Sequence, residues 1–232
     1  MQGASLAGQR GLTIIELLLY LTLSSLLIAG IYQTFATQQK SYVHQNTAAE
    51  LQQNLRTGMY LMTKDIHSAG YNPARRNGIG FVTTFPAPND KFTIDYATQN
   101  TIIAFTADAN GNGSIEPNDS EMLAYRFNAA DHTLERFKAA NTVAGGSWEA
   151  IADHVEMVNF IALAQDGTVT TEAKKIRAVE IALLVRGHKP DPQFTTQEVY
   201  RNKQGVVLCQ TCSGDHYHRR LLTTTAQARN LL

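Results

Sequence analysis

The chain has 232 residues, of which 44% are hydrophobic and 17% charged, and its 20 basic residues are balanced by 20 acidic ones. This length is enough for one domain with a packed core and an appendage. The balanced charge gives no electrostatic signature of nucleic-acid binding, and the low charge argues against a disordered acidic or basic chain. Two cysteines exclude a disulfide-rich miniprotein.

The first element in chain order is an apolar run at residues 12–32. It has about 21 residues, or roughly 31 Å as a helix, which is enough to cross the hydrocarbon core of a bilayer. A short polar leader precedes it, and Arg10 is the only charged side chain in that leader. A secretory signal peptide would have a shorter apolar run that ends at a cleavage site of small residues. We therefore favour a transmembrane helix over a signal peptide.

Glu16 is the only charged residue within this run. A carboxylate at the centre of a membrane helix costs roughly 2.5–3.5 kcal/mol on insertion scales, and such residues usually have a function. The alternative is that Glu16 lies near the helix end and reaches water. That alternative accounts for its tolerance in the membrane but gives no reason for its presence.

Residues 11–16, with the sequence GLTIIE, resemble the cleavage motif of type IV prepilins. The resemblance implies that a prepilin peptidase cuts after Gly11 and N-methylates Leu12. It also implies that Glu16, which becomes the fifth residue of the mature chain, makes an assembly contact. The family usually has phenylalanine where this chain has Leu12.

Residues 33–69 are more polar but keep helical spacing. No proline occurs before Pro73, so the pattern predicts one helix over residues 12–69, with its transmembrane part at 12–32 and its end near Gly70. Gly30 and Gly58 are weak points of roughly 1 kcal/mol each. A single apolar stripe is expected to face a folded domain, and it consists of Leu51, Leu55, Met59, Met62 and Ile66.

From Gly78 onward the sequence changes to short runs typical of β-strands. Since no helical pattern separates these runs, they predict an antiparallel sheet in a β-rich domain over residues 70–232. The run at 176–186 alternates in a mostly half-buried pattern. The fold class is therefore α+β, and the resemblance implies a pilin-like arrangement of a long N-terminal helix packed on the sheet. The expected strands are 79–84, 101–106, 122–127, 133–137, 155–163, 176–186 and 218–228.

Several further segments resemble PilW-type minor pilins, namely residues 51–56, 65–66, 69–71 and 219–225. This resemblance implies a low-abundance subunit that helps to initiate or cap a type IV pilus. It implies storage in the bacterial inner membrane with the C-terminal domain in the periplasm, followed by entry into the pilus. The implied partners are other major and minor pilins, the prepilin peptidase and the pilus assembly platform.

Two alternatives remain open at this point. One is a pseudopilin of a type II secretion system, and the other is a membrane-anchored periplasmic metalloenzyme. The sequence contains no G-x-S-x-G, P-loop or H-E-x-x-H motif and no arrangement that predicts catalytic residues, so we expect a protein that is not an enzyme.

Residues 108–119 follow the calcium-loop pattern D-x-[DN]-x-[DN]-G-x5-E except at the last position, where Asp119 replaces glutamate. Gly113 would supply the sharp turn, and the shorter reach of Asp119 predicts weak binding. The alternative is a solvated hairpin loop, because the same residue types favour turns. The predicted calcium ligands are Asp108, Asn110, Asn112, Ser114, Glu116 and Asp119.

Cys209 and Cys212 form a C-x-x-C pair close to His216 and His218. A domain that follows a membrane helix lies in an oxidising compartment, which favours a local disulfide. A zinc site remains open as an alternative, although this spacing is shorter than that of usual zinc motifs. Free thiols remain open as well. A thioredoxin-like redox motif is disfavoured because no βαβ pattern surrounds the pair.

Overall fold

The computed structural model describes residues 13–85, 92–98, 100–116, 121–138, 146–210 and 212–231. The predicted cleavage positions, Gly11 and Leu12, and the predicted ligand Asp119 lie outside the described residues. The chain divides into two compact units, with the boundary between Asn46 and Thr47. Each unit is described below by itself.

The long helix α1 spans Ile14–Ser68 and contributes to both units, as the absence of proline predicted. In the first unit its large apolar side chains, from Ile14 to Phe35, are between 53% and 81% exposed. Hydroxyl groups in this part donate to backbone carbonyls of the same helix. Thr22 donates to the carbonyl of Leu19 at 2.9 Å, and Thr34 donates to that of Gly30 at 2.9 Å. The helix is therefore long and apolar enough to cross a membrane, and these backbone-bonded hydroxyls suit an apolar surrounding.

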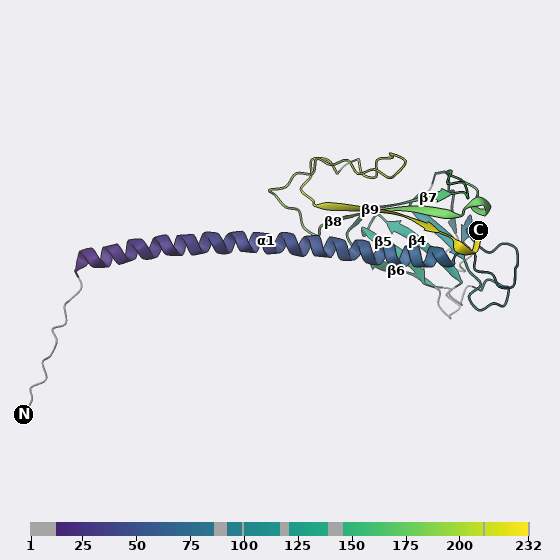
Figure 1. The fold of residues 1–232 in the computed structure, drawn as a ribbon, viewed down its shortest axis with the longest axis horizontal. Helices are drawn as coiled ribbons and strands as arrows, with labels where there is room; N and C mark the ends of the chain where they lie inside the picture. The colour runs from purple at the N-terminus through teal and green to yellow at the C-terminus, as the bar shows by residue number, and fades with distance from the viewer. Residues whose placement is uncertain are drawn as a thin grey trace, which may run out of the picture. The chain divides into compact units, whose positions relative to one another are not determined.

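In the second unit, α1 buries the predicted stripe. Leu51, Leu55, Met59, Met62 and Ile66 are all between 0% and 7% exposed. They share one core with strand residues from both larger sheets, including Leu134, Val158 and Ile181. Burying side chains of this size stabilises the folded state by about 1.5–3 kcal/mol each. Figure 1 shows this part of α1 running beside β4 (Met122–Asn128), β5 (Thr133–Lys138) and β6 (Ser147–Ala152).

Within the described residues, the strands form three antiparallel sheets where a single sheet was expected. One sheet has the order β3 (Ile102–Thr106), β4 (Met122–Asn128), β5 (Thr133–Lys138) and β6 (Ser147–Ala152). A second has the order β7 (Val155–Leu163), β8 (Ala178–Arg186) and β9 (Arg219–Gln227). A small hairpin pairs β1 (Thr84–Phe85) with β2 (Phe92–Thr93), and two short 3₁₀ helices span Ala173–Lys175 and Arg229–Leu231. The predicted α+β class is confirmed.

Two strand predictions fail for local reasons. The predicted strand at 79–84 is wrong, because only Thr84 belongs to a strand there and Phe81 makes a single bridge with Phe105. Gly80, with a φ of +139°, interrupts the extended backbone just before Phe81. The edge strand β6 was missed, because its mostly exposed residues lack a regular alternation of buried and exposed positions.

The middle strand β8 is buried on both faces, which corrects the half-buried pattern expected for residues 176–186. Ile181 and Leu183 face the core beneath α1. Ala182 and Leu184 face the other side, where Tyr200 and Leu208 cover them. The segment that connects β8 with β9, described over residues 187–210 and 212–218, therefore covers the outer face of the sheet, and we call it the cover segment.

Candidate functional site

Glu16 lies in the first turn of α1 and bonds to Thr13 in a reciprocal cap. The Thr13 hydroxyl lies 3.4 Å from Oε2 of Glu16, and the Glu16 backbone N–H donates to the Thr13 hydroxyl at 3.3 Å. The Thr13 backbone N–H also points to the same carboxylate at 3.5 Å. This is the capping-box pattern Thr-x-x-Glu, which satisfies backbone donors at a helix start. The sequence contains that signal, and it gives Glu16 a local role that the prepilin motif alone does not suggest.

Asp65, at the other end of α1, joins the helix to the four-stranded sheet. Its Oδ2 accepts a hydrogen bond from the Tyr125 hydroxyl of β4 at 2.5 Å and lies 2.7 Å from Nε of Arg136 of β5. Burial, together with the negative charge of Asp65, raises the pKa of the Tyr125 hydroxyl, so this hydroxyl stays a donor at every physiological pH. The three side chains hold α1 at one position along the sheet, and we call them the Asp65 lock.

The predicted calcium loop begins at a buried carboxylate. Asp108 is 0% exposed, and its two oxygens accept backbone N–H bonds from Gly111 at 2.8 Å and Gly113 at 3.0 Å. Gly113 has a φ of +81°, so it does supply the sharp turn. Asn110 and Asn112 each accept a bond from the backbone N–H two residues further on, as in Asx turns. The loop backbone is thus wound around the first predicted ligand.

A second buried carboxylate, Glu121, faces the same loop. It is 0% exposed, and it accepts backbone N–H bonds from Asn110 at 3.3 Å and Glu116 at 2.9 Å. The pattern from 108 to 119 ends two residues before Glu121, so the motif could not point to it. Each carboxylate oxygen retains a second lone pair, so Asp108 and Glu121 keep the capacity to bind a cation.

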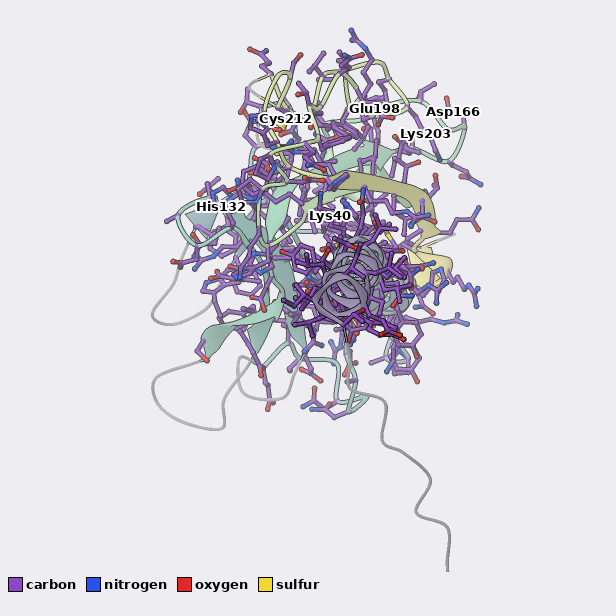
Figure 2. All side chains as sticks on the ribbon, turned by 90° about the vertical axis from the view of Figure 1, so that its left-hand side faces the viewer. Lys40, His132, Asp166, Glu198, Lys203 and Cys212 are labelled. Carbon is purple, nitrogen blue, oxygen red and sulfur yellow. A yellow bond between two sulfur atoms is a disulfide. The ribbon has the colours of Figure 1, made fainter. Side chains whose placement is uncertain are left out.

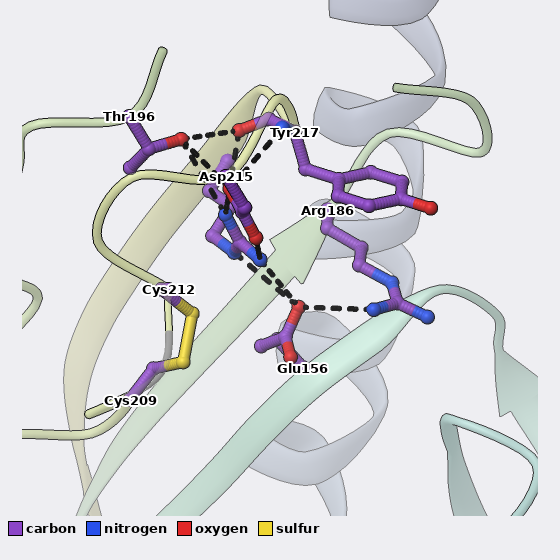
Figure 3. The surroundings of a disulfide bond; sticks show 8 residues. Glu156, Arg186, Thr196, Cys209, Cys212, Asp215 and Tyr217 are labelled. Atoms are coloured by element: carbon purple, nitrogen blue, oxygen red, sulfur yellow. Dashed lines mark hydrogen bonds and ion pairs between the residues drawn. A yellow bond between two sulfur atoms is a disulfide. The ribbon is translucent and has the colours of Figure 1, made fainter.

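Cys209 and Cys212 form a disulfide, with their Cα atoms 5.6 Å apart, as favoured from the sequence (Figure 3). The zinc alternative fails because the two sulfurs are bonded to each other. The nearby histidines have other partners, since His216 bonds to the carbonyl of Phe194 and Nε2 of His218 lies 3.1 Å from Asp191. In Figure 2, Cys212 lies with Glu198 and Lys203 in the cover segment, and His132 lies apart from them.

Next to the disulfide, partly buried ion pairs fasten the cover segment to the sheet (Figure 3). The Arg219 side chain is 2% exposed and lies 2.5 Å from Asp215 and 3.1 Å from Glu156 of β7. Glu156 also pairs with Arg186 of β8 at 3.5 Å. The hydrogen bond from Arg219 is the main cause that lowers the pKa of Asp215 to about 2. No sequence pattern predicted this network, because its members are separated by up to 63 residues.

Residues 44–203, more than half of the chain, match the model of the PpdB family, described as prepilin peptidase-dependent protein B. The chain belongs to this family. No curated protein matches the chain. Among solved structures, the chain is similar to the type IV-like pilin TTHA1219 from Thermus thermophilus, at 17% identity and a TM-score of 0.49. That likeness covers 78% of this chain and 97% of the pilin chain.

Membership of the PpdB family confirms the prepilin resemblance drawn from residues 11–16. The PpdB match begins at residue 44, so it rests on residues that the prepilin motif does not include. The membrane-length helix and this family together indicate that the chain is anchored in a membrane. The calcium ligands and the cleavage position stay predictions.

Proposed function

We propose that the chain is a PilW-type minor pilin, a membrane-stored subunit that helps to initiate or cap a type IV pilus. The observation that carries the proposal is the lone carboxylate of Glu16 in an exposed apolar helix, in a chain of a prepilin peptidase-dependent family. Within residues 13–39, Glu16 is the only charged side chain. The charge of this carboxylate is costly in a bilayer and is not needed for the cap with Thr13, so we assign the charge a role in another state.

In the proposed mechanism, the prepilin peptidase cuts after Gly11 and N-methylates the new amino terminus at Leu12. The C-terminal domain then stands in the periplasm while the helix remains in the inner membrane. In the pilus, helices of major and minor pilins pack together, and the amine of one subunit can pair with Glu16 of its neighbour. Breaking a buried pair of this kind costs roughly 3–5 kcal/mol, because the remaining charge is stranded. The pair thus stabilises a subunit whose helix has the correct axial position relative to its neighbour while the assembly platform builds the pilus.

The capping box provides a sharp test of this mechanism, in a strain whose own copy of the gene is deleted. Glu16→Gln keeps an oxygen for the cap, because glutamine also serves at this position of a capping box, but it removes the charge. Thr13→Val removes the cap and keeps the charge. We expect Glu16→Gln and Glu16→Ala to be processed and membrane-resident yet to leave the cells without pili, whereas Thr13→Val restores piliation.

Mass spectrometry of the mature chain checks that each variant starts at N-methylated Leu12, and Gly11→Val is the control that stays full-length. Wild-type piliation with Glu16→Gln would reduce Glu16 to a helix cap. Normal pili together with lost protein secretion in the deletion strain would instead identify a pseudopilin of a type II secretion system.

We also propose that the loop starting at Asp108 binds calcium, with Glu121 supplying a carboxylate in addition to the predicted ligands. The support is that two buried carboxylates, Asp108 and Glu121, face one loop whose Asn110 and Asn112 offer further oxygens. The expected dissociation constant is on the order of 10⁻⁴–10⁻³ M, the range of extracellular modules.

Calorimetry of the full chain in detergent tests the calcium proposal. Asp108→Ala and Glu121→Gln should each abolish the heat of calcium binding, and calcium should raise the melting temperature of the wild type only. Asp131→Asn, in the exposed β4–β5 turn, is the matched control and should bind like the wild type. Equal calcium heats for the wild type and Glu121→Gln would remove Glu121 from the ligand set, and absence of heat in the wild type would leave a plain hairpin loop.

A further inference from the structure

Two histidines from distant parts of the sequence bring their imidazole nitrogens together in the second unit. Nδ1 of His188 lies 3.1 Å from Nε2 of His154, and the two ring centroids are 4.7 Å apart. Oε1 of Glu50 on α1 lies 3.9 Å from the same Nε2 of His154. The His154 and Glu50 side chains are 31% and 43% exposed, so solvent and ions can reach them.

The backbone holds His154 in place independently of its ring. His154 occupies the turn between β6 and β7 with a φ of +56°, a left-handed conformation that is uncommon for residues with a side chain. Its carbonyl accepts a hydrogen bond from the N–H of Arg186 at 2.9 Å. The carbonyl of Asp153 accepts one from the side chain of Asn54 on α1 at 3.1 Å. The turn is therefore fastened both to β8 and to the helix.

His188 follows a glycine that is held just as closely. The N–H of Gly187 donates to the carbonyl of His218 at 2.8 Å. A Cβ atom at Gly187 would lie 3.0 Å from Cγ2 of Thr47, so the chain at Gly187 passes close to the Thr47 side chain of α1. The backbone that carries each imidazole is thus held by contacts of its own, and its position does not depend on the contact between the two rings.

This spacing matches what a tetrahedral metal ion requires. With Zn–N bonds of about 2.0–2.1 Å, two ligand nitrogens lie roughly 3.3–3.4 Å apart, which is within a few tenths of an ångström of the 3.1 Å found here. Oε1 of Glu50 lies 3.9 Å from Nε2 of His154, and its side chain is 43% exposed, so it can turn toward an ion held by the two imidazoles. Imidazole nitrogens with a carboxylate favour zinc-class transition metals over calcium or magnesium, which prefer oxygen ligands.

We propose that His154, His188 and Glu50 form a site for a zinc-class divalent metal ion, with solvent at the fourth position. The ion joins helix α1 to the β6–β7 turn and to the segment after β8, three parts of the chain that meet at one end of the domain. Its effect is to strengthen the attachment of α1 to the sheets. This role is separate from the proposed assembly contact at Glu16 and from the calcium loop.

The experiment uses the full chain in detergent, titrated with zinc chloride by calorimetry and with cobalt(II) by visible absorption. We expect one saturable equivalent, a cobalt spectrum typical of four-coordinate nitrogen and oxygen ligands, and a higher melting temperature with zinc. His188→Ala should weaken binding by more than about 10-fold, and Glu50→Gln should weaken it to a smaller degree. His154→Asn should also abolish binding, and asparagine tolerates the left-handed backbone.

The matched control is His216→Ala, because His216 is an exposed imidazole in the same unit whose ring bonds to the carbonyl of Phe194. This variant should bind zinc like the wild type. Since His188 is exposed, circular dichroism should show that His188→Ala stays folded, and this variant decides the outcome if His154→Asn does not fold. Unchanged zinc affinity in His188→Ala, or no saturable equivalent in the wild type, would overturn the site and leave a hydrogen bond between two imidazoles.

Discussion

The two parts of helix α1 place the same kinds of side chain in opposite surroundings. From Ile14 to Phe35 the large apolar residues are more than half exposed, whereas the stripe from Leu51 to Ile66 is almost fully buried. The first part is apolar all around its axis, and the second is apolar on one face only. A helix that is apolar on every face is stable in an apolar solvent or among other helices. A helix that is apolar on one face needs only a sheet that covers this face. Membrane anchoring and domain stability thus belong to different parts of one element.

The largest test of this contrast compares one buried and one exposed apolar residue. Met62 is 0% exposed, so Met62→Ala should lower the free energy of unfolding by about 2–5 kcal/mol. Leu26 is 74% exposed, so Leu26→Ala should change it by less than about 0.5 kcal/mol. Denaturant titration in detergent, followed by the fluorescence of Trp148, the only tryptophan, measures both. Equal losses in the two variants would contradict the division of roles.

The two glycines of α1 sharpen the same comparison. A Cβ atom at Gly58 would lie 3.0 Å from Leu134 and 3.2 Å from Leu183, whereas a Cβ at Gly30 would have nothing within 4 Å. Gly58→Val should therefore destabilise the domain by about 1–3 kcal/mol through overpacking. Gly30→Val should leave the Trp148 unfolding transition unchanged. A neutral Gly58→Val variant would mean that the core beneath α1 adjusts freely.

Acid should give the smallest effect and should act on the second unit alone. Because the folded-state pKa of Asp215 is lowered from 3.8 to about 2, its stabilising contribution is complete above pH 4 and is lost as the pH falls toward 2. Allowing for solvent screening of a partly exposed group, that contribution is about 1 kcal/mol.

Asp215→Asn should remove this part of the pH dependence, which equilibrium unfolding at pH 5, 4, 3 and 2 measures as a difference from the wild type. Asp131→Asn, in an exposed turn, serves as the control and should keep the wild-type slope. The same slope in the wild type and Asp215→Asn would show that the pair with Arg219 does not stabilise the native state.

Local patterns predicted what depends on neighbours in the sequence. The stripe at Leu51 and Met62 repeats every three or four residues, and the helix has no proline to interrupt it, so both its extent and its buried face could be predicted. The disulfide was favoured because Cys209 and Cys212 are three residues apart in a domain expected to lie in an oxidising compartment. The cap between Thr13 and Glu16 also had a local signal, the Thr-x-x-Glu spacing. The prepilin motif led to a different interpretation of Glu16.

Features that depend on long-range packing could not be predicted in this way. Glu121 faces the loop of Asp108 only because the strand after the loop returns beside it. His154 and His188 are 34 residues apart, and their meeting requires β7 and β8 to pair in the observed register. The double burial of β8 depends on the cover segment, whose irregular backbone has no periodic pattern.

The Asp65 lock has a mechanical consequence. A helix that is held by apolar contacts alone can slide along a sheet, since such contacts have no preferred direction. The hydrogen bonds from Tyr125 and Arg136 to one carboxylate are directional. Their donor–acceptor distances lie within a fraction of an ångström of the optimum. Tension applied along α1 in the second unit is therefore resisted in shear at this point, and β4 and β5 take up the load together. The second unit therefore keeps the register between α1 and these strands under such a pull.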